Sequence, residues 1–393
     1  MRLVKMRVAL ITEIIAPYRI PVFNALARDP GIDLQVIFLS ETDPSLRQWP
    51  IYKDEIDFSY QVLPHWRAGV GARRLLINWG VKHALDRFSP EAIVCGGYNY
   101  IASWQAKRWS SLNKVPLLAW IESTSQDKRS GLGAVEAMKA NFLSECAGVI
   151  VAGRSSMEYA KSFNVASDRI VVAPDAVDND FFKRAAEAAR SSAESVRERM
   201  NLPKRYFLYC GRLVREKGVF DLLEAYAALP PSIRCEVGLV FAGDGQARAK
   251  LESIARQQTL GEIRFTGFQR REQLAELYAL ADALVFPTHS DPWGLVVNEA
   301  MACGLPVIAT IVAGCVADLV EDGWNGRVVD KRNPRQLASA MAEIASHPDI
   351  TLLGGRSAER IGRNSPERCA AGFVEAIQAC SPKQEEMSAG ATA

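Results

Sequence analysis

Short apolar runs alternate with longer helical stretches along most of the chain. The runs lie at residues 8–11, 34–39, 92–95, 117–120, 148–152, 170–173, 207–210, 238–242, 263–266, 283–286 and 306–309. A continuous apolar run followed by a helix is typical of a parallel strand in a sheet that is covered on both faces. The pattern therefore predicts an α/β protein with two Rossmann-like parallel-sheet domains.

A charged, Ala/Ser-rich segment separates the two series of runs. We expect residues 1–175 to form the first domain and residues 205–365 the second, with a junction at 176–204 made of a polar helix with little apolar face. A chain of 393 residues is long for a single core, which also favours two domains. Residues 381–393 are small and polar and are expected to be disordered.

Charge is distributed unevenly between the two halves. The whole chain carries a net charge of only +2, which argues against a nucleic-acid partner. Residues 1–175 hold 21 Lys and Arg against 17 Asp and Glu, a net +4, which leaves −2 for the remainder. The basic excess includes Arg67, Arg73, Arg74, Lys107 and Arg108, the last two beside Trp104 and Trp109. It is either a solvated face or a surface that meets anionic lipid or a phosphorylated acceptor.

The cysteines and histidines argue against disulfide bonds and a protein-bound metal ion. Eight cysteines show no C-x-x-C spacing and mostly lie in apolar runs, as in buried, reduced thiols of a cytoplasmic protein. The four histidines show no metal-ligand spacing. Glu13 interrupts the N-terminal apolar run, and no window has about 20 apolar residues, so we expect neither a signal peptide nor a membrane span. A cytoplasmic protein is expected, peripheral at the inner face of the plasma membrane if the basic surface binds lipid.

Two acids mark the segment 287–309. Asp291 falls in a loop after an apolar run, a helix is expected to begin near Gly294, and Glu299 follows about one turn inside that helix. Backbone N–H groups at a helix start suit a phosphate, and a carboxylate can accept hydrogen bonds from sugar hydroxyls. The pattern fits a nucleotide-sugar pocket, although acids near a helix start are also ordinary α/β architecture.

Two cations follow the strand expected at 207–210. Arg212 and Lys217 stand five positions apart in the turn that opens the next helix. Ligands of doubly wound sheets bind at the carboxyl ends of strands, and an Arg fork with a Lys point charge suits a diphosphate. Two surface cations are the alternative, although a helix start is the less favourable end for them.

These segments resemble glycosyltransferase family 4, whose members have the GT-B fold. Its donor-site signature is usually Glu, seven residues, Glu, then Ala and a Gly-x-Pro-Val turn; here Glu299-Ala300 and the turn at 304–307 match, but Asp291 replaces the first Glu. The Gly-Arg-Leu-x-x-x-Lys-Gly motif is similar to the family's diphosphate motif. The segment 264–268 resembles the one whose backbone borders the donor base, through Gly267 and Phe268.

The resemblance implies two domains facing a central cleft, with residues 366–380 crossing back to the first domain. It implies transfer of a sugar from a nucleotide-diphosphate donor of the UDP or GDP type, with retention and with no metal or further cofactor. Arg212, Lys217 and the amides near Gly294 and Leu295 would stabilise the leaving diphosphate, Glu299 would bind ribose, and Asp291 would contact the transferred sugar. The acceptor would be a saccharide or lipid-linked, as in the synthesis of cell-surface polysaccharides or glycoconjugates.

The first domain departs from the family pattern. The usual Gly-Gly turn is replaced by residues 16–21, where Arg19 either supplies charge or belongs to a rigid turn. The usual His is replaced by Glu122, which either orients an acceptor hydroxyl or ends a strand. Tyr98 and Asn99 are further candidates for the cleft.

Three smaller features leave alternatives open. His289 is either a donor-loop ligand or a structural residue, and the D-x-D pattern at 178–180 is interpreted as a helix cap rather than a metal site. Because of the departures in the first domain, a non-catalytic sugar-nucleotide-binding protein and a GT-B-type epimerase stay open as alternatives to the transferase.

Overall fold

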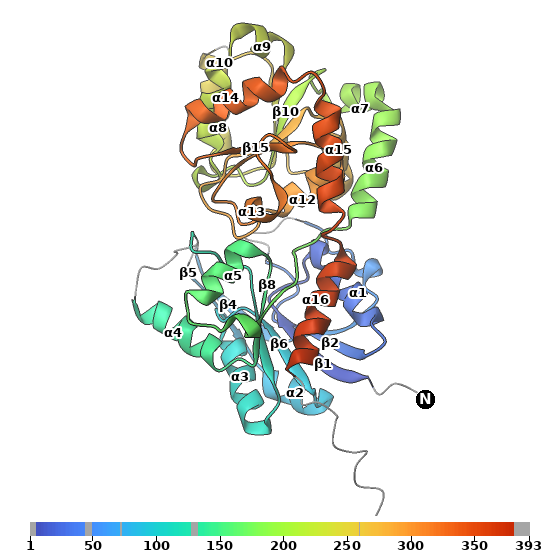
Figure 1. The fold of residues 1–393 in the computed structure, drawn as a ribbon, viewed down its shortest axis with the longest axis vertical. Helices are drawn as coiled ribbons and strands as arrows, with labels where there is room; N and C mark the ends of the chain where they lie inside the picture. The colour runs from blue at the N-terminus through green and yellow to red at the C-terminus, as the bar shows by residue number, and fades with distance from the viewer. Residues whose placement is uncertain (1–4, 44–48, 71–72, 127–132, 259, 381–393) are drawn as a thin grey trace, which may run out of the picture.

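The computed structural model describes residues 5–43, 49–70, 73–126, 133–258 and 260–380. It contains two parallel sheets, each covered by helices, stacked along the longest axis of the molecule (Figure 1). The tail expected to be disordered, 381–393, lies outside these residues, and so do residues 71–72 of the basic segment.

The first sheet has seven strands in the order β3-β2-β1-β6-β7-β8-β9, and every neighbouring pair is parallel. Its strands are β1 (Met6–Thr12), β2 (Ile32–Phe38), β3 (Ser59–Val62), β6 (Ala92–Gly96), β7 (Leu117–Ile121), β8 (Gly148–Val151) and β9 (Ile170–Val172). Its helices are α1 (Ile20–Arg28), α2 (Val81–Phe88), α3 (Ile101–Asn113), α4 (Gly133–Ser144) and α5 (Arg154–Lys161). Alternate residues of β1 enter different cores, Val8 with α1 and Ala9 with α2 and α3, so both faces of the sheet are apolar.

The second sheet has six parallel strands in the order β12-β11-β10-β13-β14-β15. Its strands are β10 (Tyr206–Cys210), β11 (Gly238–Ala242), β12 (Ile263–Gly267), β13 (Ala283–Phe286), β14 (Val307–Thr310) and β15 (Gly326–Val329). Its helices are α8 (Val219–Ala227), α9 (Pro231–Glu236), α10 (Arg248–Gln257), α11 (Arg271–Leu280), α12 (Leu295–Ala302), α13 (Val316–Leu319), α14 (Pro334–Ala345) and α15 (Ile350–Ile361).

All eleven apolar runs predicted from the sequence form strands of these sheets, and no end differs by more than two residues. Strands β3 and β15, each at one edge of its sheet, were not predicted. An edge strand is covered less completely than a central one, so its apolar run is short or interrupted. Also not predicted was an antiparallel hairpin, β4 (His65–Val70) with β5 (Arg73–Asn78), which forms a separate two-stranded sheet.

The segment between the sheets is helical, as expected, but it is not solvent-facing. Helices α6 (Asn179–Ser191) and α7 (Ala193–Met200) bury Phe182, Ala186, Ala189 and Val196 in a core shared with β10 and α12. The expectation of little apolar face is therefore wrong. Residues at spacings of three, four and seven share one face of a helix, and small alanines on that face allow close packing against α11.

The last described helix, α16 (Pro366–Ala379), returns to the first domain as the resemblance implied (Figure 1). Phe373 and Ile377 are buried in the core with β1, and the ring of Phe373 lies 5.0 Å from that of Trp120. A Cβ at Gly372 would lie 2.7 Å from the Cα atom of Ala173, so only glycine permits this approach. The backbone of α16 is therefore in direct contact with the end of β9.

Candidate nucleotide-sugar site

The loops at the carboxyl ends of β10, β11 and β12 are joined by backbone hydrogen bonds. The Gly211 N–H donates to the Ala242 carbonyl oxygen, and the Gly243 N–H donates to that of Gly267, each at 2.8–2.9 Å. A Cβ at Gly243 would overlap the Gly211 carbonyl oxygen. Glycine therefore lets the loops pack together, and this fixes the turn that carries the two predicted cations.

Lys217 and Asp291, predicted from separate motifs, form an ion pair. Lys217 Nζ lies 2.5 Å from Asp291 Oδ2, and the two side chains are 17% and 18% exposed. Lys217 ends the 3₁₀ turn η4 (Arg215–Lys217), and Asp291 follows β13, so the adjacent strands β10 and β13 bring them together. Asp291 Oδ1 also accepts a hydrogen bond from the Trp293 N–H at 3.3 Å, which orients the carboxylate.

Arg212 lies on the same loop as Lys217 but is exposed. Its carbonyl oxygen accepts a 2.8 Å hydrogen bond from the Tyr209 hydroxyl, so the backbone is held while the side chain extends into solvent. The two cations therefore differ: the charge of Lys217 is compensated by Asp291, whereas the guanidinium of Arg212 is accessible to an anion.

Glu299 lies inside α12 and is half-buried. Its Oε2 accepts a hydrogen bond of 2.8 Å from the hydroxyl of Tyr278 on α11. Burial raises the pKa of Glu299 to about 7, and the Tyr278 hydrogen bond opposes that rise. A carboxylate in this position has acceptor capacity left for ligand hydroxyls.

Helix α12 begins as predicted, with Gly294 preceding Leu295. Gly294 has φ +101°, and a Cβ there would lie 2.7 Å from the Phe286 ring. No side chain caps this helix start at Gly294, and the first N–H groups of a helix have no acceptor within the helix itself. The Trp293 indole N–H donates to Asn298, whose side-chain amide donates to the Asp175 carbonyl oxygen in the segment after β9. The helix start is thereby fixed against the first domain.

Gly267 and Phe268 lie at the carboxyl end of β12, at the same edge as the cations. Gly267 has φ +73°, and its carbonyl oxygen is used by Gly243, whereas the Phe268 side chain is 43% exposed. An exposed aromatic ring at this edge can stack on or border a nucleobase. The arrangement is compatible with the role that the resemblance implied.

On the first domain, Arg19 and Glu122 form an ion pair. The guanidinium of Arg19 also lies 3.8 Å from Asp175 Oδ1 and 3.8 Å from the ring centre of Trp120. Burial raises the pKa of Asp175, and the charge of Arg19 lowers it. The sequence analysis treated Arg19 and Glu122 as separate candidates, but the fold makes them one unit at the carboxyl ends of β1 and β7.

Three other candidates, Tyr98, His289 and Asp178, make contacts that hold the fold together. Tyr98 is 2% exposed and packs against Phe142, so the prediction that it lines the cleft is wrong, while Asn99 beside it is exposed. His289 Nε2 lies 2.8 Å from Asp221 Oδ2, a contact that holds the donor loop to α8. Asp178 caps α6 by accepting a hydrogen bond from the Phe181 N–H, which confirms the cap interpretation.

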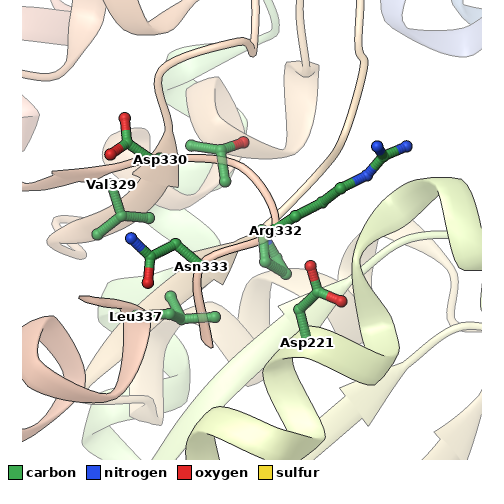
Figure 2. A pocket seen from close by; sticks show the side chains of 8 residues that line it. Asp221, Val329, Asp330, Arg332, Asn333 and Leu337 are labelled. Atoms are coloured by element: carbon green, nitrogen blue, oxygen red, sulfur yellow. The ribbon is translucent and has the colours of Figure 1, made fainter. Parts of the chain in front are cut away.

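Figure 2 shows a hollow in the second domain, where Asp221, Asp330, Arg332 and Asn333 lie near the apolar side chains of Val329 and Leu337. It is too small to admit a water molecule. The guanidinium of Arg332 extends away from the hollow in this view. The hollow is therefore a packing feature of the second domain, at the carboxyl ends of β13, β14 and β15.

The proposed basic surface of the first domain is only partly present. Lys107 is 8% exposed, pairs with Glu145 and lies 4.9 Å from the ring centre of Trp104. Trp109 is 7% exposed, so α3 directs these residues into the core rather than outward. Arg67 pairs with the buried Asp43, and the side chains of Arg73 and Arg74 lie outside the described residues.

Sequence reasoning missed two sets of contacts. Tyr278, the partner of Glu299, lies 21 positions away on another helix, and no local pattern marks it. Arg271, at the start of α11, donates from Nη1 to Glu55 of the first domain at 2.8 Å and lies 3.8 Å from the ring centre of Tyr52. This contact joins the two domains next to Phe268.

The described residues include neither a metal-binding cluster nor a membrane-spanning helix. Among them, no group of three or more His, Cys, Asp or Glu side chains is arranged to hold a metal ion. None of the helices there is long and apolar enough to cross a membrane. All eight cysteines are free thiols, and six of them are buried, with Cys235 exposed and Cys380 partly exposed.

The sequence of this chain is similar to those of known glycosyltransferases. The chain is 29% identical over 256 residues to a D-inositol 3-phosphate glycosyltransferase of Xylanimonas cellulosilytica, covering 62% of this chain and 60% of that protein. It is 34% identical over 174 residues to the alpha-D-kanosaminyltransferase of Streptomyces kanamyceticus, covering 44% of each. The chain thus spans less than two thirds of the length of these curated relatives.

Structural similarity extends over both domains. The structure of Anabaena HepE in complex with UDP and glucose matches 95% of this chain and 100% of that one, with a TM-score of 0.73 and 17% sequence identity. This match confirms the predicted GT-B architecture of two Rossmann-like domains. Residues 192–368 match the family model described as glycosyl transferases group 1. The matched region covers most of the second domain, including Arg212, Lys217, Asp291 and Glu299, so this part of the chain is similar to the glycosyl transferases group 1 family.

Proposed function

We propose that this protein is a retaining, metal-independent glycosyltransferase. It takes a sugar from a UDP- or GDP-type donor and attaches it to a saccharide or lipid-linked acceptor, in the synthesis of a cell-surface polysaccharide or glycoconjugate. The observation that carries the proposal is the Lys217–Asp291 ion pair, because it joins a cation suited to a diphosphate with an acid suited to a sugar. The relatives named glycosyltransferases support the reaction class.

When the donor binds, its diphosphate would replace Asp291 as the partner of Lys217. The accessible guanidinium of Arg212 offers two parallel hydrogen bonds to the diphosphate. Lys217 Nζ then turns from Asp291 Oδ2 to the same anion, and the amides at Gly294 and Leu295 add the helix N-terminus. These groups stabilise the charge that develops on the leaving nucleoside diphosphate.

Once Lys217 has moved to the diphosphate, the Asp291 carboxylate is available to the transferred sugar. Asp291, held by the Trp293 N–H, accepts hydrogen bonds from hydroxyls of the transferred sugar and favours the positive charge of its oxocarbenium-like transition state. Glu299 binds the ribose hydroxyls, and Gly267 and Phe268 border the base. The UDP in the structurally similar Anabaena protein supports a uridine donor.

The acceptor would meet the sugar from the first domain. Glu122, held by Arg19, accepts a hydrogen bond from the acceptor hydroxyl and orients it toward the anomeric carbon. In a retaining reaction the leaving diphosphate itself can take the hydroxyl proton, so no protein nucleophile is assigned. Closure of the domains excludes water from the donor. Contact with an anionic membrane brings the protein to a lipid-linked acceptor.

The proposal is tested first without knowledge of the acceptor. Thermal shifts are measured with UDP, GDP, ADP and their sugar conjugates, on the wild type and on Arg212→Ala/Lys217→Ala. A ligand at about 100 times its Kd adds about 2.7 kcal/mol to the free energy of unfolding. We expect one base to stabilise the wild type and to have no effect on the double variant. The absence of any shift would contradict the donor site.

The nucleotide found in this way is then used in acceptor screens. NMR of the product anomeric proton reports retention, and the same reaction in excess EDTA reports metal independence. A donor sugar that is interconverted without acceptor would show the epimerase instead. Binding without turnover on any acceptor would favour the non-catalytic sugar-nucleotide-binding protein.

A further inference from the structure

Arg271, at the start of α11, attaches this helix of the second domain to the first domain. Its Nη1 donates a hydrogen bond of 2.8 Å to Glu55 Oε2, and its Nη2 donates to Glu55 Oε1. Two parallel hydrogen bonds of this kind fix the orientation of a guanidinium as well as its position. The guanidinium also lies 3.8 Å from the ring centre of Tyr52 and 4.7 Å from that of Phe181, so two aromatic rings limit its movement further.

The position of Glu55 is itself fixed within the first domain. Glu55 ends the 3₁₀ turn η2 (Lys53–Glu55). The Asn24 side-chain amide donates to the Glu55 carbonyl oxygen at 2.7 Å, and Asn24 Oδ1 accepts a hydrogen bond of 2.8 Å from the Asp57 N–H. Asn24 lies on α1 and is 8% exposed. The turn is therefore bound to a buried residue of the first domain, and its carboxylate is held in place for Arg271.

Helix α11 connects the contacts expected for the nucleoside part of the donor. The loop of Gly267 and Phe268, which would border the base, leads directly into α11 at Arg271. Tyr278 stands seven residues after Arg271, and so on the same face of the helix. Its hydroxyl donates to Glu299, which would bind the ribose. A movement of α11 would therefore displace the base contact and the ribose contact together.

A second set of contacts joins the two domains at α5 and α13. The Arg154 N–H donates to Asp318 Oδ2 at 3.0 Å, and the Ser155 hydroxyl donates to the Gly314 carbonyl oxygen at 3.1 Å. These groups follow β8 and β14, and none of them lies on α11. Loss of the ion pair between Arg271 and Glu55 would thus leave the domains attached through α5, while α11 would lose its ionic link to the first domain.

We infer that Glu55 is a positioning residue for the donor site, which acts through Arg271 and α11 on the nucleoside contacts of the second domain. The inference rests on the proposed donor site and adds a residue of the first domain to it. Nucleoside binding and the ion pair favour each other, because each stabilises the same position of α11. Arg212 and Lys217, which would bind the diphosphate, precede α8 and do not lie on α11. Inorganic pyrophosphate, which has no nucleoside, is therefore expected to bind independently of Glu55.

The test compares UDP and GDP with inorganic pyrophosphate by isothermal titration calorimetry on the full chain. Glu55→Gln removes the charge and leaves the backbone hydrogen bond to Asn24 in place. We expect this variant to bind the nucleoside diphosphate at least about fivefold more weakly than the wild type and to bind pyrophosphate equally well. Glu276→Gln is the matched control, because Glu276 also lies on α11 but pairs with Arg199 of α7, at 2.7 Å. The control is expected to bind both ligands as the wild type does.

A double-mutant cycle tests whether Glu55 acts through Arg271. Adding Glu55→Gln to Arg271→Gln is expected to cause no further loss of nucleotide affinity, since the partner is already absent. Additive losses would contradict this route. Equal nucleotide affinity of Glu55→Gln and the wild type would overturn the inference, and so would an equal loss of pyrophosphate affinity, which would indicate a general effect on the protein. Unchanged circular dichroism establishes that the variants are folded.

Hydrogen exchange of the ligand-free protein separates failure of this inference from failure of the donor site. Amides of residues 267–278 are expected to exchange faster in Glu55→Gln than in the wild type and in Glu276→Gln. Equal exchange in all three proteins would show that Glu55 does not hold α11, and would overturn the inference whatever the ligands do. A wild type that binds neither nucleotide nor pyrophosphate would contradict the proposed donor site, while the exchange rates would still decide whether Glu55 holds α11.

Discussion

Ionisation of Glu299 is predicted to make the stability of the ligand-free protein depend on pH. Burial raises the pKa of this carboxyl from 4.5 to about 7 in the folded chain. The folded state thus favours the neutral form, whose stabilising effect is complete below pH 4.5 and is lost as the pH rises through 7. At about 1.36 kcal/mol per pKa unit, a shift of this size changes the free energy of unfolding by about 3 kcal/mol.

Replacement by Gln isolates this effect, because Gln keeps the length of the side chain and one acceptor oxygen but does not ionise. We expect Glu299→Gln to be about 1 kcal/mol more stable than the wild type at pH 5 and about 3 kcal/mol more stable at pH 8. The measurement is urea unfolding at both pH values, followed by circular dichroism. Other titrating groups are common to both proteins and cancel in the difference.

Tyr278→Phe provides an independent check of the cause. The Tyr278 hydroxyl donates to Glu299 and lowers its pKa, so its removal is expected to shift the pH dependence to higher pH. Saturating nucleotide is expected to act in the opposite direction, since ribose hydroxyls favour the ionised carboxylate. If the difference between Glu299→Gln and the wild type is the same at pH 5 and pH 8, burial does not control this carboxyl and the reasoning is refuted.

Three further predictions concern the neighbouring loops. Asp291→Asn is expected to lower kcat by roughly 10²–10³-fold with little change in KM, because the carboxylate acts on the transition-state charge; steady-state kinetics that show an equal loss in donor affinity would make it a binding residue. Arg212→Ala is expected to weaken nucleoside diphosphate binding by roughly 10–100-fold in calorimetry, whereas Arg215→Ala on the same loop keeps wild-type affinity; an equal loss in both would indicate a general charge effect. Gly218→Ala is expected to cost roughly 1–3 kcal/mol in thermal unfolding, because its φ is +69° and a Cβ would overlap a backbone carbonyl oxygen. Gly355→Ala, with open space at its Cβ inside α15, is expected to be neutral or stabilising, and a loss equal to that of Gly218→Ala would contradict the steric argument.

The sequence by itself determined the two sheets and placed four candidate site residues at one edge of the second sheet. Central parallel strands are buried on both faces, so each leaves a continuous apolar run, and all eleven predicted runs became strands. The carboxyl ends of such strands form one edge, which allowed Arg212, Lys217, Asp291 and Glu299 to be named together before their geometry was known. The cap at Asp178 was also readable, because capping depends on residues within one turn.

Only the tertiary structure decided which charges are compensated and which face solvent. Arg19 met Glu122, and Arg271 met Glu55, across sequence separations that no local pattern records. Lys107 entered the core instead of a basic surface, since its burial depends on what packs against α3. The burial and ion pairing of a side chain depend on contacts between distant segments, so they were not predictable from the sequence. Hydrophobic periodicity and helix capping depend on residues within one segment, so the sequence predicted them.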